Sequence, residues 1–221
     1  IDHVGADSVE LTLLNESDKV ILSFAYSLHP SSGWNADTNS IPPGMKLRER
    51  VGLRPALARG ESRPIVTVMA VLFDDGTVDG DPAAGMDLQQ SQRGHSEAEV
   101  AIGYLIRQQR FSSNPGLDVM SSADLKVRIR DLRDSIRLLP EPSFEDESGN
   151  LFRASYLEAF RSTVAVSLSQ LDQMLEDRAD EYSEEASASV CRQLMSRFTA
   201  LSDKMVSTGK VFLDGMARTQ R

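Results

Sequence analysis

The chain has 221 residues, of which 40% are hydrophobic and 26% charged, and its formal net charge is −9. This length suffices for one large domain or two small ones of ordinary globular composition. The acidic balance argues against nucleic-acid binding, which needs a basic surface that displaces phosphate counterions. No apolar run approaches the roughly 20 residues that cross a bilayer, so we expect no transmembrane segment. The single cysteine, Cys191, excludes an intrachain disulfide and a cysteine-based zinc site, and its helical surroundings predict a core residue.

The first strands are predicted from alternation of apolar and polar residues. Residues 8–15 (SVELTLLN) and 19–28 (KVILSFAYSL) each place apolar side chains on one face, which predicts two half-buried strands. The NESD segment between them, residues 15–18, predicts a hairpin connection. Residues 29–44 are rich in turn formers and predict a surface loop. We expect Trp34 in this loop to fold back over the edge of a core, with a platform for a ligand as the alternative.

Two further strands are expected before residue 88. Residues 45–53 (MKLRERVGL) alternate imperfectly and predict a weak edge strand. Residues 63–73 (RPIVTVMAVLF) are apolar on both faces, which predicts a central strand covered on both sides.

From about residue 90 the apolar period changes to that of a helix. Amphipathic helices are predicted over residues 96–111, 121–139, 150 to about 175, and 184–217. Ser121 and Asp124 have capping-box spacing, and Asn150 is a candidate cap for the third helix. The seam of the second helix consists of Leu125, Ile129, Leu132, Ile136 and Leu139. The last two helices are long, and we expect them to pair antiparallel in a helical bundle.

The stretch FDDGTVDGDPAAGM, residues 73–86, concentrates aspartates and glycines behind the strongest strand. A calcium loop of the EF type would place ligands at Asp75, Thr77 and Asp79, but its twelfth position is Met86, which cannot coordinate calcium. Asp75-Gly76 instead predicts a two-residue type I′ hairpin turn, followed by a short return strand. Asp75, Asp79 and Asp81 therefore remain only weak candidates for a metal site. Residues 85–94 are the expected junction between the two halves.

A second weak metal candidate is the pair His95 and Glu99, four residues apart on one helical face. Because we expect a helix to start here, the pair is interpreted as part of the helix cap. The acidic run at residues 144–148 (FEDES) is interpreted as an exposed link. No nucleophile elbow, P-loop or dinucleotide-binding motif is present, so no catalytic or cofactor-binding residue is assigned and no cofactor is expected.

Two segments together resemble a pattern in bacterial exported proteins: LLNESDKVILSFAYSL and ARGESRPIVTVMAVLFDDGTVDGD. The resemblance covers roughly residues 8–81. It implies an Ig-like sandwich of the kind found in cell-envelope proteins, and it implies no known activity. It also implies export to the periplasm or the extracellular space. The chain starts at Ile1 without an initiator methionine, and we expect a signal peptide to have been removed before it.

These observations predict an α+β protein: an Ig-like antiparallel β-sandwich over residues 1–88, then a helical region of about four helices over residues 89–221. The favoured function is a non-enzymatic envelope or secreted module that binds a protein, self-associates or serves as a structural part. The alternative is a hydrolase or metal-dependent enzyme with its site at the junction between sandwich and helices. Convergent ionisable groups in a deep pocket, including His95, would favour the enzyme.

Overall fold

The computed structural model describes eight stretches of the chain: residues 2–5, 8–29, 35–37, 40–52, 65–109, 121–142, 152–176 and 184–219. Strands precede helices, so the protein is α+β as predicted. The chain divides into two compact units: residues 1–89 together with 214–221, and residues 90–213. The division expected at residue 88 differs from this one in leaving residues 214–221 with the helices. Trp34, residues 144–148 and Asn150 lie outside the described residues.

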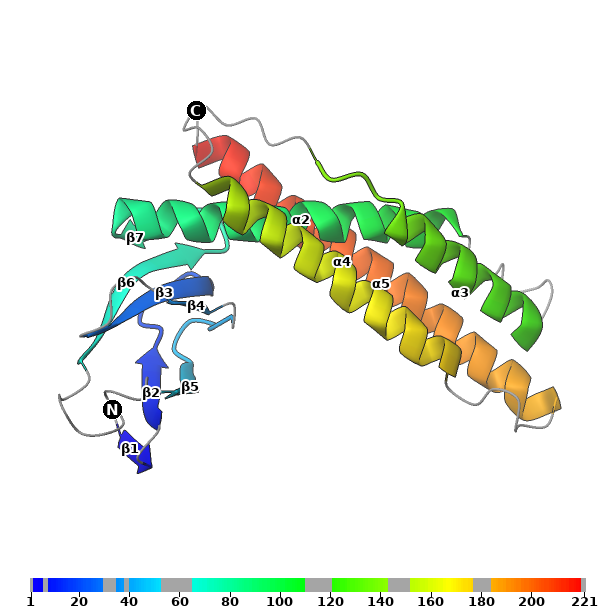
Figure 1. Ribbon diagram of the computed structural model, residues 1–221, viewed down its shortest axis with the longest axis horizontal. Coiled ribbons are helices and arrows are strands. Elements are labelled where there is room, and N and C mark those ends of the chain that lie inside the picture. Colours follow the sequence, from blue (N-terminus) through cyan, green and yellow to red (C-terminus); the bar gives the residue numbers. More distant parts are fainter. Residues whose placement is uncertain are drawn as a thin grey trace. The chain divides into compact units, whose positions relative to one another are not determined.

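The first unit contains two antiparallel sheets (Figure 1). One has the strand order β1-β2-β5 and the other β4-β3-β6-β7. Apolar side chains from both sheets form one core, centred on Leu11, Phe24, Tyr26, Leu28 and Ile41. The strands are β1 (Asp2–Gly5), β2 (Ser8–Leu14), β3 (Ile21–His29), β4 (Asn35–Asp37), β5 (Lys46–Gly52), β6 (Ile65–Phe73) and β7 (Val78–Gly80).

The predicted hairpin between the first two long strands is wrong. β2 pairs with β5, and β3 pairs with β6, so the NESD segment crosses from one sheet to the other. Asn15 is buried there. Its side-chain amide donates hydrogen bonds to the carbonyls of Lys19 (2.8 Å) and Ile41 (2.7 Å), and its Oδ1 accepts one from the Ser17 backbone (3.0 Å). These hydrogen bonds hold the chain where it passes from one sheet to the other. The apolar periodicity of the strands does not predict this passage.

The edge and central positions of β5 and β6 agree with the prediction, because β5 ends its sheet and β6 lies between β3 and β7. The expectation that β6 is covered on both faces is wrong for its first half, where Ile65 and Val68 are 57% and 42% exposed. In its second half, Ala70 and Leu72 are buried on one face, and Val71 on the other face is half-buried against the sheet core. The prediction failed because apolar residues on both faces of a strand are compatible with burial, but they do not show that other elements cover the whole length of the strand.

Helix α2 (Pro82–Gln108) begins fourteen residues before the predicted start at residue 96. The side chain of Asp81 accepts hydrogen bonds from the backbone of Ala83 (3.0 Å) and Ala84 (2.9 Å), and Pro82 occupies the first turn, where its missing N–H is not needed. The junction expected at residues 85–94 is therefore helical. Its two glycines are packing positions: a Cβ on Gly85 would lie 2.2 Å from Val78 Cγ1, and one on Gly94 would lie 2.2 Å from the Tyr156 carbonyl oxygen.

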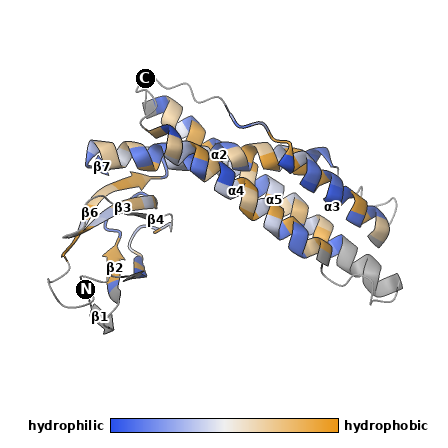
Figure 2. Ribbon diagram, in the orientation of Figure 1, coloured by the Kyte–Doolittle hydropathy of each residue, from blue (hydrophilic) through white to orange (hydrophobic). Residues whose placement is uncertain are grey.

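The second unit is a helical bundle built from α2, α3 (Ser122–Arg137), α4 (Arg153–Glu176) and α5 (Glu184–Thr219). All five residues of the predicted seam lie in or against the apolar core of the bundle, together with Phe198 and Leu171, and Leu139 does so from just beyond the end of α3. Ser121 caps α3 by accepting a hydrogen bond from the Asp124 backbone at 3.1 Å, which confirms it as the N-cap, and its hydroxyl donates to the Asp124 carboxylate at 2.7 Å. The visible face of α3 is mainly hydrophilic (Figure 2), as expected for a helix whose apolar side faces the core. Cys191 lies in α5, and its side chain is outside the described part.

Small residues let α2 and α5 approach closely at two places, seven residues apart on each helix. A Cβ on Gly103 would lie 3.2 Å from the Ser202 carbonyl oxygen, and one on Gly209 would lie 2.7 Å from the Ser96 carbonyl oxygen. The Ser202 hydroxyl also donates a buried hydrogen bond to the Gly103 carbonyl, at 2.8 Å. The two contacts pair residues in opposite sequence order, so α2 and α5 run antiparallel. No described helix is long and apolar enough to cross a membrane.

Candidate functional site

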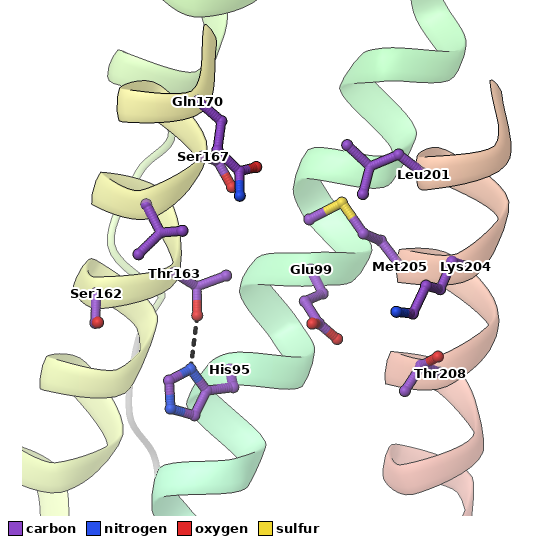
Figure 3. A pocket seen from close by; sticks show the side chains of 11 residues that line it. His95, Glu99, Ser162, Thr163, Ser167, Gln170, Leu201, Lys204, Met205 and Thr208 are labelled. Carbon is purple, nitrogen blue, oxygen red and sulfur yellow. Dashed lines mark hydrogen bonds between the residues drawn. The ribbon is translucent and has the colours of Figure 1, made fainter. Parts of the chain in front are cut away.

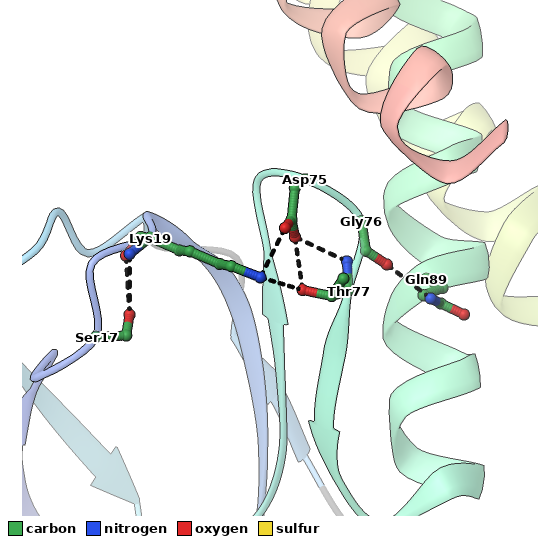
Figure 4. A network of polar contacts seen from close by, with 6 residues as sticks. All are labelled: Ser17, Lys19, Asp75, Gly76, Thr77 and Gln89. Carbon is green, nitrogen blue, oxygen red and sulfur yellow. Dashed lines mark hydrogen bonds and ion pairs between the residues drawn. The ribbon is translucent and has the colours of Figure 1, made fainter. Parts of the chain in front are cut away.

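The Asp-Gly stretch behind β6 is a hairpin turn, as predicted, but not a two-residue type I′ turn (Figure 4). The Gly76 backbone donates to the Phe73 carbonyl at 3.0 Å, and the Phe73 backbone donates to the Thr77 carbonyl at 2.9 Å. These bonds enclose a three-residue loop of Asp74, Asp75 and Gly76. Gly76 takes the left-handed conformation, with φ of 81°, that such a loop requires at its last position.

The Asp75 carboxylate already has bonding partners within and beside this turn. Its carboxylate forms an ion pair with Lys19 Nζ at 2.7 Å and accepts hydrogen bonds from the Thr77 backbone (3.0 Å) and hydroxyl (2.6 Å). Partial burial opposes ionisation, but the bonds from Lys19 and Thr77 outweigh it and lower the pKa of Asp75 to about 2. The ion pair links the turn to Lys19, which lies in the segment that leads into β3.

The other two aspartates of the stretch do not join Asp75. Asp79 is exposed on β7, and Asp81 caps α2. Among the residues that the structure describes, no three His, Cys, Asp or Glu side chains are grouped so that they could hold a metal ion.

A pocket of about 330 Å³ lies in the helical unit between α2, α4 and α5 (Figure 3). We call it the bundle pocket. Three kinds of side chain line it: ionisable groups from α2 and α5, hydroxyl and amide groups chiefly from α4, and apolar groups from α4 and α5. Its lining residues are His95, Glu99, Ser162, Thr163, Val166, Ser167, Gln170, Leu201, Lys204, Met205 and Thr208.

His95 projects from the middle of α2, so the cap interpretation of this residue is wrong. Its Nδ1 lies 2.7 Å from the Thr163 hydroxyl, and that hydroxyl lies 3.0 Å from the Ala159 carbonyl oxygen. A carbonyl oxygen only accepts, so the single hydroxyl proton is directed to Ala159 and Nδ1 donates to Thr163. We therefore assign the Nδ1–H tautomer. Burial lowers the pKa of His95, which keeps the ring neutral near pH 7.

Glu99 lies one turn further along α2, half-buried in the wall of the bundle pocket, and it is not a cap either. Burial raises its pKa, and the positive charge of Lys204 on α5 opposes this shift. Figure 3 shows the Lys204 ammonium pointing toward the Glu99 carboxylate. Glu99 nevertheless forms no hydrogen bond and no ion pair with any described residue. A half-buried carboxylate without a donor is energetically costly, and a bound ligand could supply one.

A set of contacts beside the pocket holds α2 against α4. The Tyr156 hydroxyl donates a short hydrogen bond to Glu97, and Arg93 pairs with the same carboxylate at 2.8 Å. The Arg93 guanidinium also lies over the Tyr156 ring, 5.5 Å from its centroid. Burial and the nearby Glu97 charge raise the pKa of Tyr156 well above its usual value, so its hydroxyl remains a donor. With Gly94 against the Tyr156 backbone, these contacts fix the helix that carries His95 and Glu99.

Sequence reasoning identified His95 and Glu99 but missed the residues that complete the pocket. Thr163 and Lys204 come from helices 68 and about 100 residues away in sequence. The one available signal was the run of small polar residues on the α4 face, Ser162, Thr163 and Ser167, where a bundle helix would ordinarily carry apolar side chains.

No family model matches the sequence, and neither a curated protein nor a solved structure does.

Proposed function

We propose that this protein is a non-enzymatic binding module that takes a small polar ligand in the bundle pocket. One observation carries the proposal: the half-buried carboxylate of Glu99 lines a pocket of about 330 Å³ and has no hydrogen-bond donor among the described residues. Pockets of a few hundred Å³ with a small number of polar groups are typical ligand sites. The other walls add hydroxyl, amide and imidazole groups that can orient a ligand.

The arrangement around His95 favours binding over catalysis. A hydroxyl nucleophile must give its proton to the neighbouring base. Here the Thr163 hydroxyl donates to the Ala159 carbonyl instead, and the ring nitrogen that faces Thr163 carries its own proton. Every residue of the bundle pocket belongs to the helical unit, so this pocket is not the junction site expected for the alternative enzyme.

For the first unit, we propose an Ig-like sandwich that serves as the structural part of an exported protein. The strand order supports this assignment, because β1-β2-β5 and β4-β3-β6-β7 correspond to the A-B-E and C′-C-F-G sheets of such sandwiches. The short β7 takes the place of the G strand and leads directly into α2. The resemblance of residues 8–81 to bacterial exported proteins supports export.

Native mass spectrometry tests the binding function. The wild-type protein is incubated with a bacterial small-molecule extract, and bound mass is recorded after buffer exchange. Ser167→Phe places a ring in the bundle pocket, and Ser169→Phe puts the same ring on the exposed side of α4 as a matched control. We expect retained ligand in the wild type and in Ser169→Phe, and none in Ser167→Phe. No retained ligand, or equal retention by all three folded proteins, would refute the function.

A further inference from the structure

The bundle pocket presents one positive and one negative side chain from different helices. Glu99 comes from α2 and Lys204 from α5, and they interact electrostatically across the space between these helices. They do not form an ion pair in direct contact, since no salt bridge joins them among the described residues. A ligand that inserts between them therefore has no close ion pair to break.

We infer that the bundle pocket binds a small zwitterion, such as a free amino acid, with its ammonium group on Glu99 and its carboxylate on Lys204. This inference rests on the proposed function and specifies its ligand class. A singly charged amine would satisfy Glu99 but would leave its own charge beside Lys204. A singly charged acid would satisfy Lys204 but would face Glu99 and leave that half-buried carboxylate without a donor. Only a molecule with both charges complements both groups.

The remaining walls fit the rest of such a molecule. Thr208 on α5 and Ser167 and Gln170 on α4 add hydroxyl and amide groups to the wall of the pocket. Val166, Leu201 and Met205 supply an apolar surface for a hydrocarbon side chain or spacer. His95 is held by Thr163 with Nδ1 occupied, so its Nε2 remains as a hydrogen-bond acceptor for an ammonium or amide N–H.

Isothermal titration calorimetry with a panel of zwitterions and their singly charged halves tests the inference. The zwitterions are L-alanine, L-leucine and γ-aminobutyrate; the halves are n-butylamine and butyrate. We expect at least one zwitterion to bind, and both halves to bind at least about tenfold more weakly, because a hydrogen bond to a charged group is lost in each case.

Two substitutions with matched controls locate the binding. Glu99→Gln and Lys204→Met should each weaken the zwitterion by about tenfold or more. Glu158→Gln and Lys210→Met change the same residue types on exposed parts of α4 and α5 outside the pocket, and should leave the affinity unchanged. Circular dichroism melts confirm that each variant is folded before titration.

The outcomes separate this inference from the proposed function. If n-butylamine binds as tightly as the best zwitterion and Lys204→Met has no effect, the site takes a cation, and the zwitterion inference is wrong while the binding function stands. If no zwitterion binds more tightly than its halves, the inference is likewise overturned. If the ligand retained in the mass-spectrometric experiment lacks the positive or the negative charge, the zwitterion inference is again wrong while the binding function stands. Retention of nothing refutes the function itself.

Discussion

The Glu99 carboxylate on α2 and the Lys204 ammonium on α5 face the same pocket and attract one another, yet they are not joined in a salt bridge. In most proteins a half-buried carboxylate obtains hydrogen-bond donors from its surroundings. Glu99 has none among the described residues. The protein thus tolerates an energetic cost at this position, and the cost is explained if a ligand relieves it.

Replacing Glu99 by its neutral isostere should stabilise the ligand-free protein. Burial raises the pKa of Glu99 above its ordinary value of 4.5. An acid with a raised pKa in the folded state contributes stability below about pH 4.5, and loses it as pH rises through the folded-state pKa. At pH 7 Glu99→Gln should therefore raise the melting temperature by about 1–3 °C. The gain should vanish in melts recorded below pH 4.5, and a lower melting temperature at pH 7 would contradict the prediction.

His95 should titrate below its ordinary pKa of 6.5 and carry its neutral proton on Nδ1. A base whose folded pKa is lowered contributes stability above pH 6.5, and loses it as pH falls through that value toward the folded-state pKa. Nitrogen-15 NMR of the imidazole measures both the midpoint and the tautomer. Thr163→Val is nearly isosteric and removes the acceptor, so it should shift the tautomer population. A midpoint above 6.5, or an Nε2–H tautomer in the wild type, would show that the assignment is wrong.

Gly94→Ala should destabilise the helical unit. The added Cβ would lie 2.2 Å from the Tyr156 carbonyl oxygen, and a backbone atom cannot move aside without shifting α4. Alanine alone would favour the helix by roughly 1 kcal/mol, so a net loss of about 1–3 kcal/mol in urea unfolding would isolate the packing term. Gly103→Ala provides a graded comparison, because its nearest obstacle is a side-chain carbon, Val206 Cγ2, at 2.6 Å. It should cost less than Gly94→Ala, and the reverse order would contradict the close contact of α2 with α4.

Asp75→Asn should destabilise the first unit at neutral pH but not near pH 2. The folded pKa of Asp75 is about 2, so its charge contributes stability above its ordinary pKa of 3.8 and loses it as pH falls toward 2. The loss at pH 7 should not exceed about 1 kcal/mol, because the Asp75 side chain is 44% exposed. Unfolding curves of wild type and variant should converge near pH 2. A difference that persists there would assign the effect to turn geometry rather than to charge.

The helical half of the fold was more predictable than the strand half. The seam from Leu125 to Leu139 and the Ser121 cap are local patterns, and local patterns fix a helix and its buried face. Strand partners depend on residues far away in sequence. The alternation in β2 and β3 gave both strands, yet it could not show that each pairs with a later strand while buried Asn15 directs the crossing between sheets.

Glycines account for the largest error in element bounds. Gly85 and Gly94 resemble a linker in sequence, but in α2 they are the points where Val78 and Tyr156 approach the helix. Only the part of the candidate site that lies on one helix could be predicted from the sequence. His95 and Glu99 lie one helical turn apart and were found together, whereas Thr163 and Lys204 reach them only through the packing of three helices.

The most direct test of ligand binding in the bundle pocket is calorimetric titration of the best-binding zwitterion into the wild type, Ser167→Phe and Ser169→Phe. We predict saturable binding to the wild type and to Ser169→Phe with equal affinity, and no measurable heat with folded Ser167→Phe. Unchanged affinity in Ser167→Phe would place the ligand elsewhere on the protein and contradict the assignment of this pocket as the binding site.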